Sequence, residues 1–145
     1  MSAIARSWRW ALARFFCWLA DAHRHFGNEY GDRQEYQKAV NNYGRAIARD
    51  PLYAQPYYSR GILYYREFGN YAGAVRDLSQ AIELRPQWAR AYFNRGLAHK
   101  MHGELAEAVA DLEQYVEMGQ HEFWLDAARR QLAEVTAIES EDRGG

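Results

Sequence analysis

A chain of 145 residues with 18 basic and 19 acidic side chains is long enough for one domain with a buried core, and its balanced charge gives no sign of nucleic-acid binding. A single cysteine, Cys17, excludes an internal disulfide and suits a reducing compartment, so we expect a cytoplasmic protein. No apolar run approaches the ~20 residues that a membrane-spanning helix needs, and Arg14 interrupts the segment that could act as a secretory signal.

The N-terminal segment has the apolar pattern of a long helix. It contains no proline, and no glycine precedes Gly27. Apolar side chains recur at spacings of three and four residues, at Ile4, Trp8, Leu12, Phe15, Leu19, Ala22, Phe26 and Tyr30. We predict an amphipathic helix over residues 1–19 that continues without a break to about residue 30, with the last members of the stripe facing the core. A break near Asp21 is the alternative, because aspartate can cap a helix.

The next helix, predicted over about residues 35–49, is too short to cover all of this N-terminal helix. Large apolar side chains are then left uncovered at Trp8, Leu12, Phe15, Phe16 and Leu19, and we predict an association surface there. The surface could pair with a second copy or with a helix of another protein, or it could lie in a membrane interface. Residues 1–20 also carry three arginines and no acid, as organellar targeting segments do. The last option is a segment folded back as a cap.

From residue 20 onward the sequence repeats itself with a period of 34 or 35 residues. YYSRG at 57–61 returns as YFNRG at 92–96. The same period relates three sets of small residues and prolines: Gly27, Gly61 and Gly96; Ala39, Ala74 and Ala108; Pro51 and Pro86. Each copy has two segments with helical apolar spacing, and Gly69 and Gly103 mark the turns between them. We predict three helix–turn–helix units, over residues 20–53, 54–88 and 89–121.

This pattern resembles the tetratricopeptide repeat (TPR) family, whose units are helix–turn–helix modules of about 34 residues. The middle copy has the family's positions at Tyr57, Arg60, Gly61, Tyr64, Ala74, Leu78 and Pro86. The first copy has His23, Phe26, Gly27, Tyr30, Ala39, Tyr43 and Pro51, and the third has Tyr92, Arg95, Gly96, His99, Ala108 and Leu112, with Gln120 in place of the proline. The resemblance implies an all-α fold, in which the repeats stack into a right-handed superhelix, an α–α solenoid.

The same resemblance implies a non-enzymatic scaffold that binds a peptide or helix of a partner protein in its concave groove, for the assembly or recruitment of a complex. In this family the first helix of each repeat lines the groove. The corresponding positions here are Arg24, Asn28, Tyr58, Ser59, Ile62, Tyr65, Arg66, Arg90, Phe93, Asn94, Leu97 and Lys100. The alternative is that a capping helix or a tight superhelix covers these aromatic side chains. A different function is also open, that of a membrane-surface or oligomer-forming structural subunit acting through the N-terminal helix.

One branch of the family holds acidic C-terminal peptides in a two-carboxylate clamp. The segment RHFGN, with Arg24 and Asn28, is similar to the opening motif of that clamp, and Arg90 matches a later cation. Ser59 stands where the clamp has asparagine, and Asn94 stands where it has a base. Two of the five positions therefore differ in chemistry, and an acidic peptide is one option for the partner.

Arginine and aspartate occur together in two of the three repeats. Arg60 comes with Asp77 and Arg95 with Asp111, whereas the first repeat has Phe26 and Asn42 at these places. A guanidinium in a repeat core needs a carboxylate. We therefore predict structural ion pairs within the second and third repeats.

Residues 122–139 place Trp124, Ala128, Leu132 and Val135 on one helical face, which predicts a helix that caps the last repeat. We expect residues 140–145 to be a disordered polar tail. His99 and His102 have no cysteine or carboxylate placed to complete a metal site, so His99 is predicted to be a packed side chain and Cys17 a small buried one. Without a phosphate-binding loop or nucleophile motif, we expect no catalytic residue, metal or cofactor.

Overall fold

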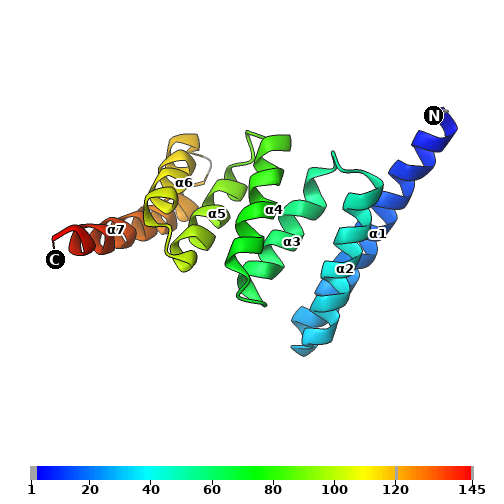
Figure 1. Cartoon of the computed structure of the whole chain (residues 1–145), viewed down its shortest axis with the longest axis horizontal. Coiled ribbons are helices and arrows are strands. Elements are labelled where there is room, and N and C mark those ends of the chain that lie inside the picture. Colours follow the sequence, from blue (N-terminus) through cyan, green and yellow to red (C-terminus); the bar gives the residue numbers. More distant parts are fainter. Residues whose placement is uncertain (1–2, 120, 145) are drawn as a thin grey trace.

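The computed structural model describes residues 3–119 and 121–144, and within this part of the chain all regular structure is helical. The helices are α1 (Ala3–Tyr30), α2 (Arg33–Arg49), α3 (Ala54–Arg66), α4 (Tyr71–Leu84), α5 (Ala89–His102), α6 (Leu105–Met118) and α7 (Glu122–Gly144). Figure 1 shows three antiparallel pairs stacked along the long axis, with α7 at the C-terminal end. This arrangement confirms the predicted all-α solenoid.

Turn residues and close helix contacts explain why each pair forms. Gly69 and Gly103 have φ of 61° and 87°, a backbone conformation that suits glycine, and they lie in the turns of the second and third repeats. Asn70 then caps α4 by accepting a hydrogen bond from the backbone N–H of Gly73 (2.9 Å). Within α3, a Cβ at Gly61 would lie 2.9 Å from Cγ of Leu78, so the two helices of the repeat approach closely at this glycine.

Helix α1 runs without a break from Ala3 to Tyr30, and its N-terminal part extends past the end of α2 (Figure 1). Asp21 lies inside this helix. Its carboxylate accepts a hydrogen bond from Oη of Tyr43 in α2 (2.6 Å), so it links the two helices and does not cap a new one. The structure therefore has neither the break near Asp21 nor the folded-back cap.

The core face of α1 differs from the predicted one. Ala13, Cys17 and Ala20 are buried, whereas Phe26 and Tyr30 are 49% and 75% exposed. The small residues of α1 leave room for large side chains of α2, such as Tyr36 and Tyr43, in the same core cluster. The prediction that the stripe ends on the core face is thus wrong.

The exposed face of α1 has a counterpart in the other repeats. Phe26 stands at the place of Arg60 in α3 and Arg95 in α5. Both arginines face the second helix of the preceding repeat: Arg95 donates a hydrogen bond to Ser79 of α4 (3.1 Å), and Nη1 of Arg60 would lie 3.4 Å from a Cβ at Gly44 of α2. Because no repeat precedes α1 in the described part of the chain, the equivalent face remains open.

The C-terminal end is closed by α7. Ala128 and Val135 are fully buried, and Leu132 packs against the cluster formed with Ala108 and Leu112 of α6. The helix also differs from the expected polar tail, because residues 140–144 continue α7; residue 145 lies outside the described residues. The capping position agrees with the apolar spacing of residues 128–135.

Candidate functional site

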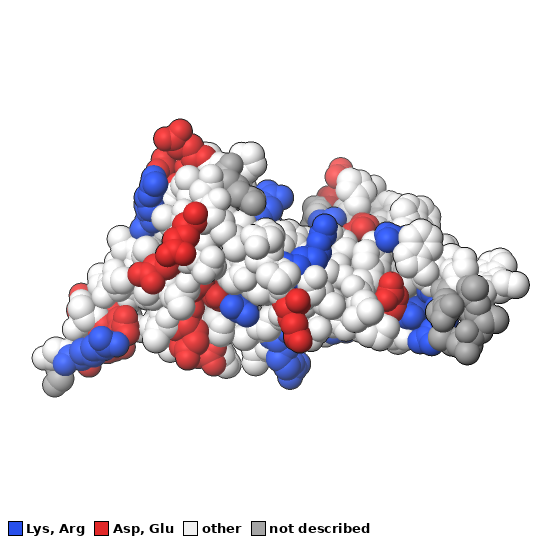
Figure 2. Space-filling model, turned by 90° about the horizontal axis from the view of Figure 1, so that it is seen from above, with Lys and Arg blue, Asp and Glu red and all other residues white. Residues whose placement is uncertain are grey.

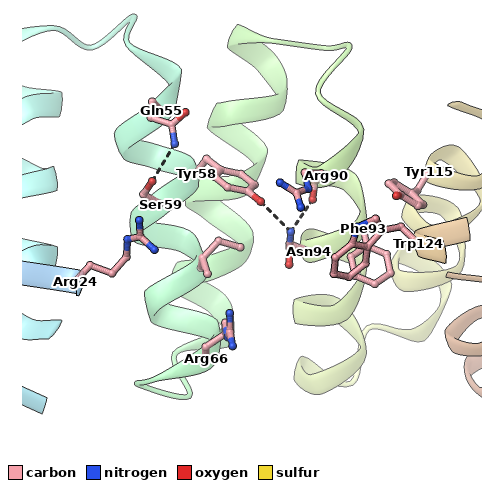
Figure 3. A pocket seen from close by; sticks show the side chains of 11 residues that line it. Arg24, Gln55, Tyr58, Ser59, Arg66, Arg90, Phe93, Asn94, Tyr115 and Trp124 are labelled. Atoms are coloured by element: carbon pink, nitrogen blue, oxygen red, sulfur yellow. Dashed lines mark hydrogen bonds between the residues drawn. The ribbon is translucent and has the colours of Figure 1, made fainter. Parts of the chain in front are cut away.

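A hollow of about 290 Å³ opens on the concave side of the solenoid. Five helices contribute to it: α1, α3, α5, α6 and α7. Its lining residues are Arg24, Gln55, Tyr58, Ser59, Ile62, Arg66, Arg90, Phe93, Asn94, Tyr115 and Trp124 (Figure 3). The curvature of the stack therefore brings the first and last helices of the chain to one site.

Hydrogen bonds and ring stacking hold the middle of this hollow in place. The ring of Tyr58 stacks on Trp88 with centroids 4.3 Å apart. The side-chain amide of Asn94 donates to Oη of Tyr58 (3.2 Å) and to the carbonyl of Arg90 (2.8 Å), which connects α3 to α5. Burial raises the pKa of Tyr58, so its hydroxyl stays protonated at neutral pH. On the other side, Gln55 donates to Oγ of Ser59 (3.1 Å).

The charged side chains that line the hollow are all basic. Three arginines line it, Arg24, Arg66 and Arg90, and no aspartate or glutamate is among its described lining residues. Arg24 contacts a carboxylate only at its margin, with Nη2 3.5 Å from Asp21, and its buried Nε has no acceptor within the described residues. The guanidinium of Arg90 lies over the ring of Trp124, 5.7 Å from the centroid. The site thus offers hydrogen-bond donors and positive charge beside aromatic surface.

Eight of the twelve predicted groove residues line the hollow, and four do not. Asn28 is exposed and accepts a hydrogen bond from Tyr36 (3.0 Å), while Tyr65 lies beside Tyr71. Lys100 pairs with Glu134 of α7 (2.8 Å). Leu97 is partly buried outside the hollow. These four positions have the predicted spacing on their helices but are not among the lining residues, and Lys100 is held by α7.

The sequence interpretation missed two aromatic residues at the C-terminal side of the hollow, Tyr115 and Trp124. Trp124 had been placed on the core face of the cap, yet it is 39% exposed. Phe93 lies between them, with centroids 5.2 Å from Tyr115 and 6.1 Å from Trp124. Phe93 is therefore partly a core residue, and the alternative that the capping helix covers a groove aromatic holds at this position.

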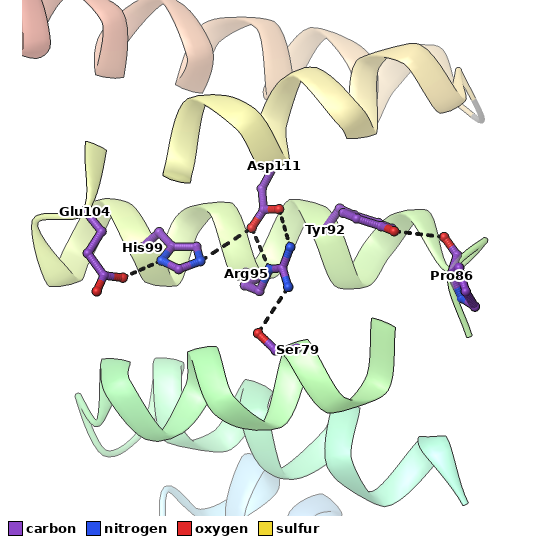
Figure 4. A network of polar contacts seen from close by, with 7 residues as sticks. All are labelled: Ser79, Pro86, Tyr92, Arg95, His99, Glu104 and Asp111. Atoms are coloured by element: carbon purple, nitrogen blue, oxygen red, sulfur yellow. Dashed lines mark hydrogen bonds and ion pairs between the residues drawn. The ribbon is translucent and has the colours of Figure 1, made fainter. Parts of the chain in front are cut away.

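The paired charges lie inside the repeats, away from the hollow. Arg60 makes two hydrogen bonds to Asp77, from Nε (2.7 Å) and Nη2 (2.8 Å). Arg95 binds Asp111 in the same way (2.7 and 2.6 Å), as Figure 4 shows. The hydrogen bond to Asp77 raises the pKa of the Arg60 guanidinium, and Asp111 does the same for Arg95. These bidentate pairs act as structural links between the two helices of a repeat.

The histidine and cysteine side chains that could bind a metal or react, His99 and Cys17, make structural contacts instead. Nδ1 of His99 lies 2.5 Å from Glu104, and its Nε2 lies 3.7 Å from Asp111, so the ring joins the polar network of the third repeat (Figure 4). No group of three or more potential metal ligands occurs among the described residues. Cys17 is buried, and burial raises the pKa of its thiol, which leaves little thiolate at neutral pH.

Stacked helix pairs, with side chains of successive helices lining a concave side, define an α-solenoid repeat protein. Models described as TPR repeat match residues 27–67 and 65–103, and a model described as tetratricopeptide repeat matches residues 89–119. The chain belongs to the tetratricopeptide repeat family, which confirms the resemblance seen in the sequence. The family fold is a protein-interaction module. A search of curated proteins finds no match, and no described helix has the length and apolarity of a membrane span.

Several solved structures are similar over most of the chain. The first TPR of Spaghetti (RPAP3) bound to the HSP90 peptide SRMEEVD is 25% identical, with 86% of this chain and 95% of that chain covered and a TM-score of 0.70. The second TPR domain of human RPAP3 in complex with the HSP70 peptide SGPTIEEVD is 25% identical over 86% and 98%, with a TM-score of 0.68. The second TPR of Spaghetti bound to SRMEEVD is 30% identical over 69% and 92%, with a TM-score of 0.58.

Proposed function

We propose that this protein is a non-enzymatic scaffold whose concave hollow binds a segment of a partner protein that carries acidic side chains or a C-terminal carboxylate. The observation that carries the proposal is the hollow itself, lined by three arginines and several aromatic side chains, without an acidic residue among those described. Such a scaffold would assemble or recruit a complex by holding a short segment of one of its members.

The charges in the hollow favour an acidic ligand. The side chain of Arg24 is 41% exposed and lines the hollow, and its contact with the Asp21 carboxylate is long at 3.5 Å. A carboxylate in the hollow would accept from Arg24 and would also meet the guanidinium of Arg66 or Arg90, with two charged hydrogen bonds in a planar fork. Aromatic surface at Tyr58 and Trp124 would contact apolar side chains of the same segment.

The similar structures add support of a general kind. All three hold peptides that end in EEVD, a sequence with two glutamates and a C-terminal aspartate. Arg24 and Arg90 match cations of the clamp that the sequence motif RHFGN resembles. Ser59 and Asn94 are engaged with Gln55 and Tyr58, respectively, so the details of peptide binding differ here. Arg66 on α3 supplies a third cation to the hollow.

The test is a titration of labelled SRMEEVD, followed by fluorescence anisotropy. We expect saturable binding that weakens with salt. Arg90→Glu should lose roughly 2 kcal/mol of binding free energy, because it replaces a cation by a negative charge that repels the acidic peptide. The matched control is Arg76→Glu, which reverses an exposed arginine on α4. A peptide with its acidic residues replaced by alanine should bind weakly. Equal binding by Arg90→Glu and the unaltered protein would refute the site.

A second candidate function is that of an oligomer-forming subunit. It is favoured by a separate observation, the exposed apolar face of α1, and it is compatible with peptide binding because the hollow and this face lie on different sides of α1.

A further inference from the structure

The open face of α1 carries a continuous row of exposed large apolar side chains. We call it the outer stripe and define it as Ile4, Trp8, Leu12, Phe15, Leu19, Ala22, Phe26 and Tyr30. Trp8 is 67% exposed, Phe15 50% and Tyr30 75%, and Trp18 beside the stripe is 65% exposed. With Phe26, these five aromatic side chains alone expose on the order of 500–700 Å². One partner of a standard protein interface contributes about 800 Å².

The architecture of the repeats shows that this face is of a type that another helix covers. Leu19, Ala22, Phe26 and Tyr30 stand at the places of Tyr53, Pro56, Arg60 and Tyr64 in the second repeat. Pro56 is fully buried, and Tyr53 and Tyr64 pack against the core cluster that α1 and α2 form. In α1, Leu19 and Ala22 are only partly buried and Phe26 and Tyr30 are exposed, because no helix of a preceding repeat lies beside them among the described residues; Phe26 stands in place of an arginine. The outer stripe therefore corresponds to the surface by which α3 packs against the preceding repeat, and in α1 this surface is apolar.

Phe16, which we had included in the predicted association surface, does not belong to it. Its side chain is partly buried against the core cluster, and the guanidinium of Arg45 lies 5.6 Å from its ring. The other four predicted residues, Trp8, Leu12, Phe15 and Leu19, are members of the outer stripe.

The spacing of the outer stripe fits a second copy of the same helix. Successive members are four, four, three, four, three, four and four residues apart, and this series reads the same in both directions. Two antiparallel copies related by a two-fold axis near Cys17 would place every member against another member: Ile4 opposite Tyr30, Trp8 opposite Phe26, Leu12 opposite Ala22, and Phe15 opposite Leu19. A two-fold contact requires this self-complementarity.

Charge favours the same orientation. Residues 3–20 of α1 carry three arginines and no acid, whereas residues 21–30 carry two acids, Asp21 and Glu29, and one arginine. An antiparallel pair places the basic half of each helix beside the acidic half of the other, and a parallel pair would place like charges together. Large side chains also oppose small or differently shaped ones, as at Leu12 and Ala22.

We propose that two copies of this chain pair through the outer stripes of their α1 helices, antiparallel and about a two-fold axis near residue 17. The pairing joins the N-terminal ends of two solenoids and leaves both concave hollows accessible. It does not depend on what the hollow binds, because the outer stripe shares no residue with the hollow.

Sedimentation of the full chain at micromolar concentrations tests the pairing. We expect a dimer, and we expect Trp8→Glu and Phe26→Glu each to weaken it about tenfold or more, since each places a charge in the buried contact. The matched control is Leu52→Glu, which changes a 78% exposed side chain in the loop before α3 and should leave the dimer intact. Circular dichroism confirms that the variants fold. A monomeric full chain, or a dimer that both stripe substitutions leave unchanged, overturns the proposal.

Disulfide cross-linking tests the register in a Cys17→Ala background. A mixture of Trp8→Cys protein and Phe26→Cys protein should cross-link between unlike chains, because these positions face one another. Each protein alone should not cross-link, since like positions lie roughly 27 Å apart along the helix at 1.5 Å per residue. Cross-linking of like chains only would show parallel pairing and reject this register. If the full chain is monomeric and floats with phosphatidylserine vesicles, the dimer proposal is rejected and the outer stripe is a membrane contact instead.

Discussion

Individual residues in this protein derive their roles from their place in the repeat. Arg60 and Arg95 could be taken for ligand contacts in isolation, yet each forms a bidentate pair with an aspartate of its own repeat that is 7% or 5% exposed. The first repeat has neither the arginine nor the aspartate, and Asn42 occupies the acid's place as a buried neutral side chain. Charge and countercharge are thus present or absent together.

The substitution Asp77→Ala removes the countercharge and leaves Arg60 partly buried without its carboxylate. We expect a loss of about 3 kcal/mol in the free energy of unfolding, because breaking one side of a buried pair leaves an uncompensated charge. Urea denaturation measures the loss. Glu83→Ala, at an exposed position of α4, is the control and should change stability by less than ~0.5 kcal/mol. An Asp77→Ala protein as stable as this control would show that the pair has no structural role.

Two glycines inside helices allow a matched comparison. A Cβ at Gly61 would lie 2.9 Å from Leu78 and 3.3 Å from Cβ of Asp77, whereas a Cβ at Gly44 would meet only the flexible Nη1 of Arg60 at 3.4 Å. Gly61→Ala should therefore destabilise the protein by about 1–3 kcal/mol through overpacking. Gly44→Ala should be neutral or stabilising by up to ~1 kcal/mol, since alanine is the better helix former. Thermal unfolding distinguishes them, and a stabilised Gly61→Ala would contradict the close approach.

At the scale of elements, α1 has two parts with different surroundings. Residues from Ala13 onward pack against α2 and the start of α3, where the guanidinium of Arg14 lies 4.8 Å from the ring of Tyr53 and Cys17 is in the core. Residues before Ala13 have no buried side chain among those described. The outer stripe therefore reaches across a part of α1 that folds with the repeats and a part that extends beyond them.

Two truncations separate these parts. Removing residues 1–11 should leave the repeats folded, with nearly unchanged stability of the monomer. Removing residues 1–19 also deletes Ala13, Phe16 and Cys17 from the core and should cost at least ~2 kcal/mol. Guanidinium denaturation at concentrations too low for pairing provides the comparison. If the two truncated proteins have the same free energy of unfolding, the core contacts of residues 12–19 do not contribute to stability.

At the scale of the whole molecule, the repeat period allowed much of the fold to be predicted. Glycine, alanine and proline at 34- or 35-residue intervals report close packing and turns, and these are local needs that the sequence must satisfy in every copy. The same logic placed Arg60 opposite Asp77. It failed for Phe26 and Tyr30, because an identical register has a different neighbour in a terminal repeat.

The candidate site was only partly predictable for a related reason. Tyr58, Ile62 and Asn94 line the hollow because they lie on the first helices of adjacent repeats. Tyr115 and Trp124 reach it because the stack curves and α7 turns across its end, and this curvature sums small rotations that no single repeat encodes. Lys100 has the right helical position but binds Glu134 of α7. Sequence periodicity therefore predicts neighbours along the stack better than contacts across it.

The cap at the C-terminal end has a consequence for how large an assembly can become. Helix α7 covers α6 with its apolar face and presents charged side chains outward, among them the exposed Asp126, Arg129 and Arg130. Figure 2 shows acidic and basic residues interspersed over that end. A fibre forms when one surface of a molecule binds a different, complementary surface of the next molecule, so that the series of contacts does not close. Within the described residues, the exposed apolar side chains of α1 form a continuous stripe, whereas those of α7, such as Phe123 and Ile138, are few and lie among charged residues. If two copies pair through the outer stripe as proposed, the contact buries this surface on both molecules. We then expect association to stop at a pair, and higher concentration to add more pairs without lengthening them.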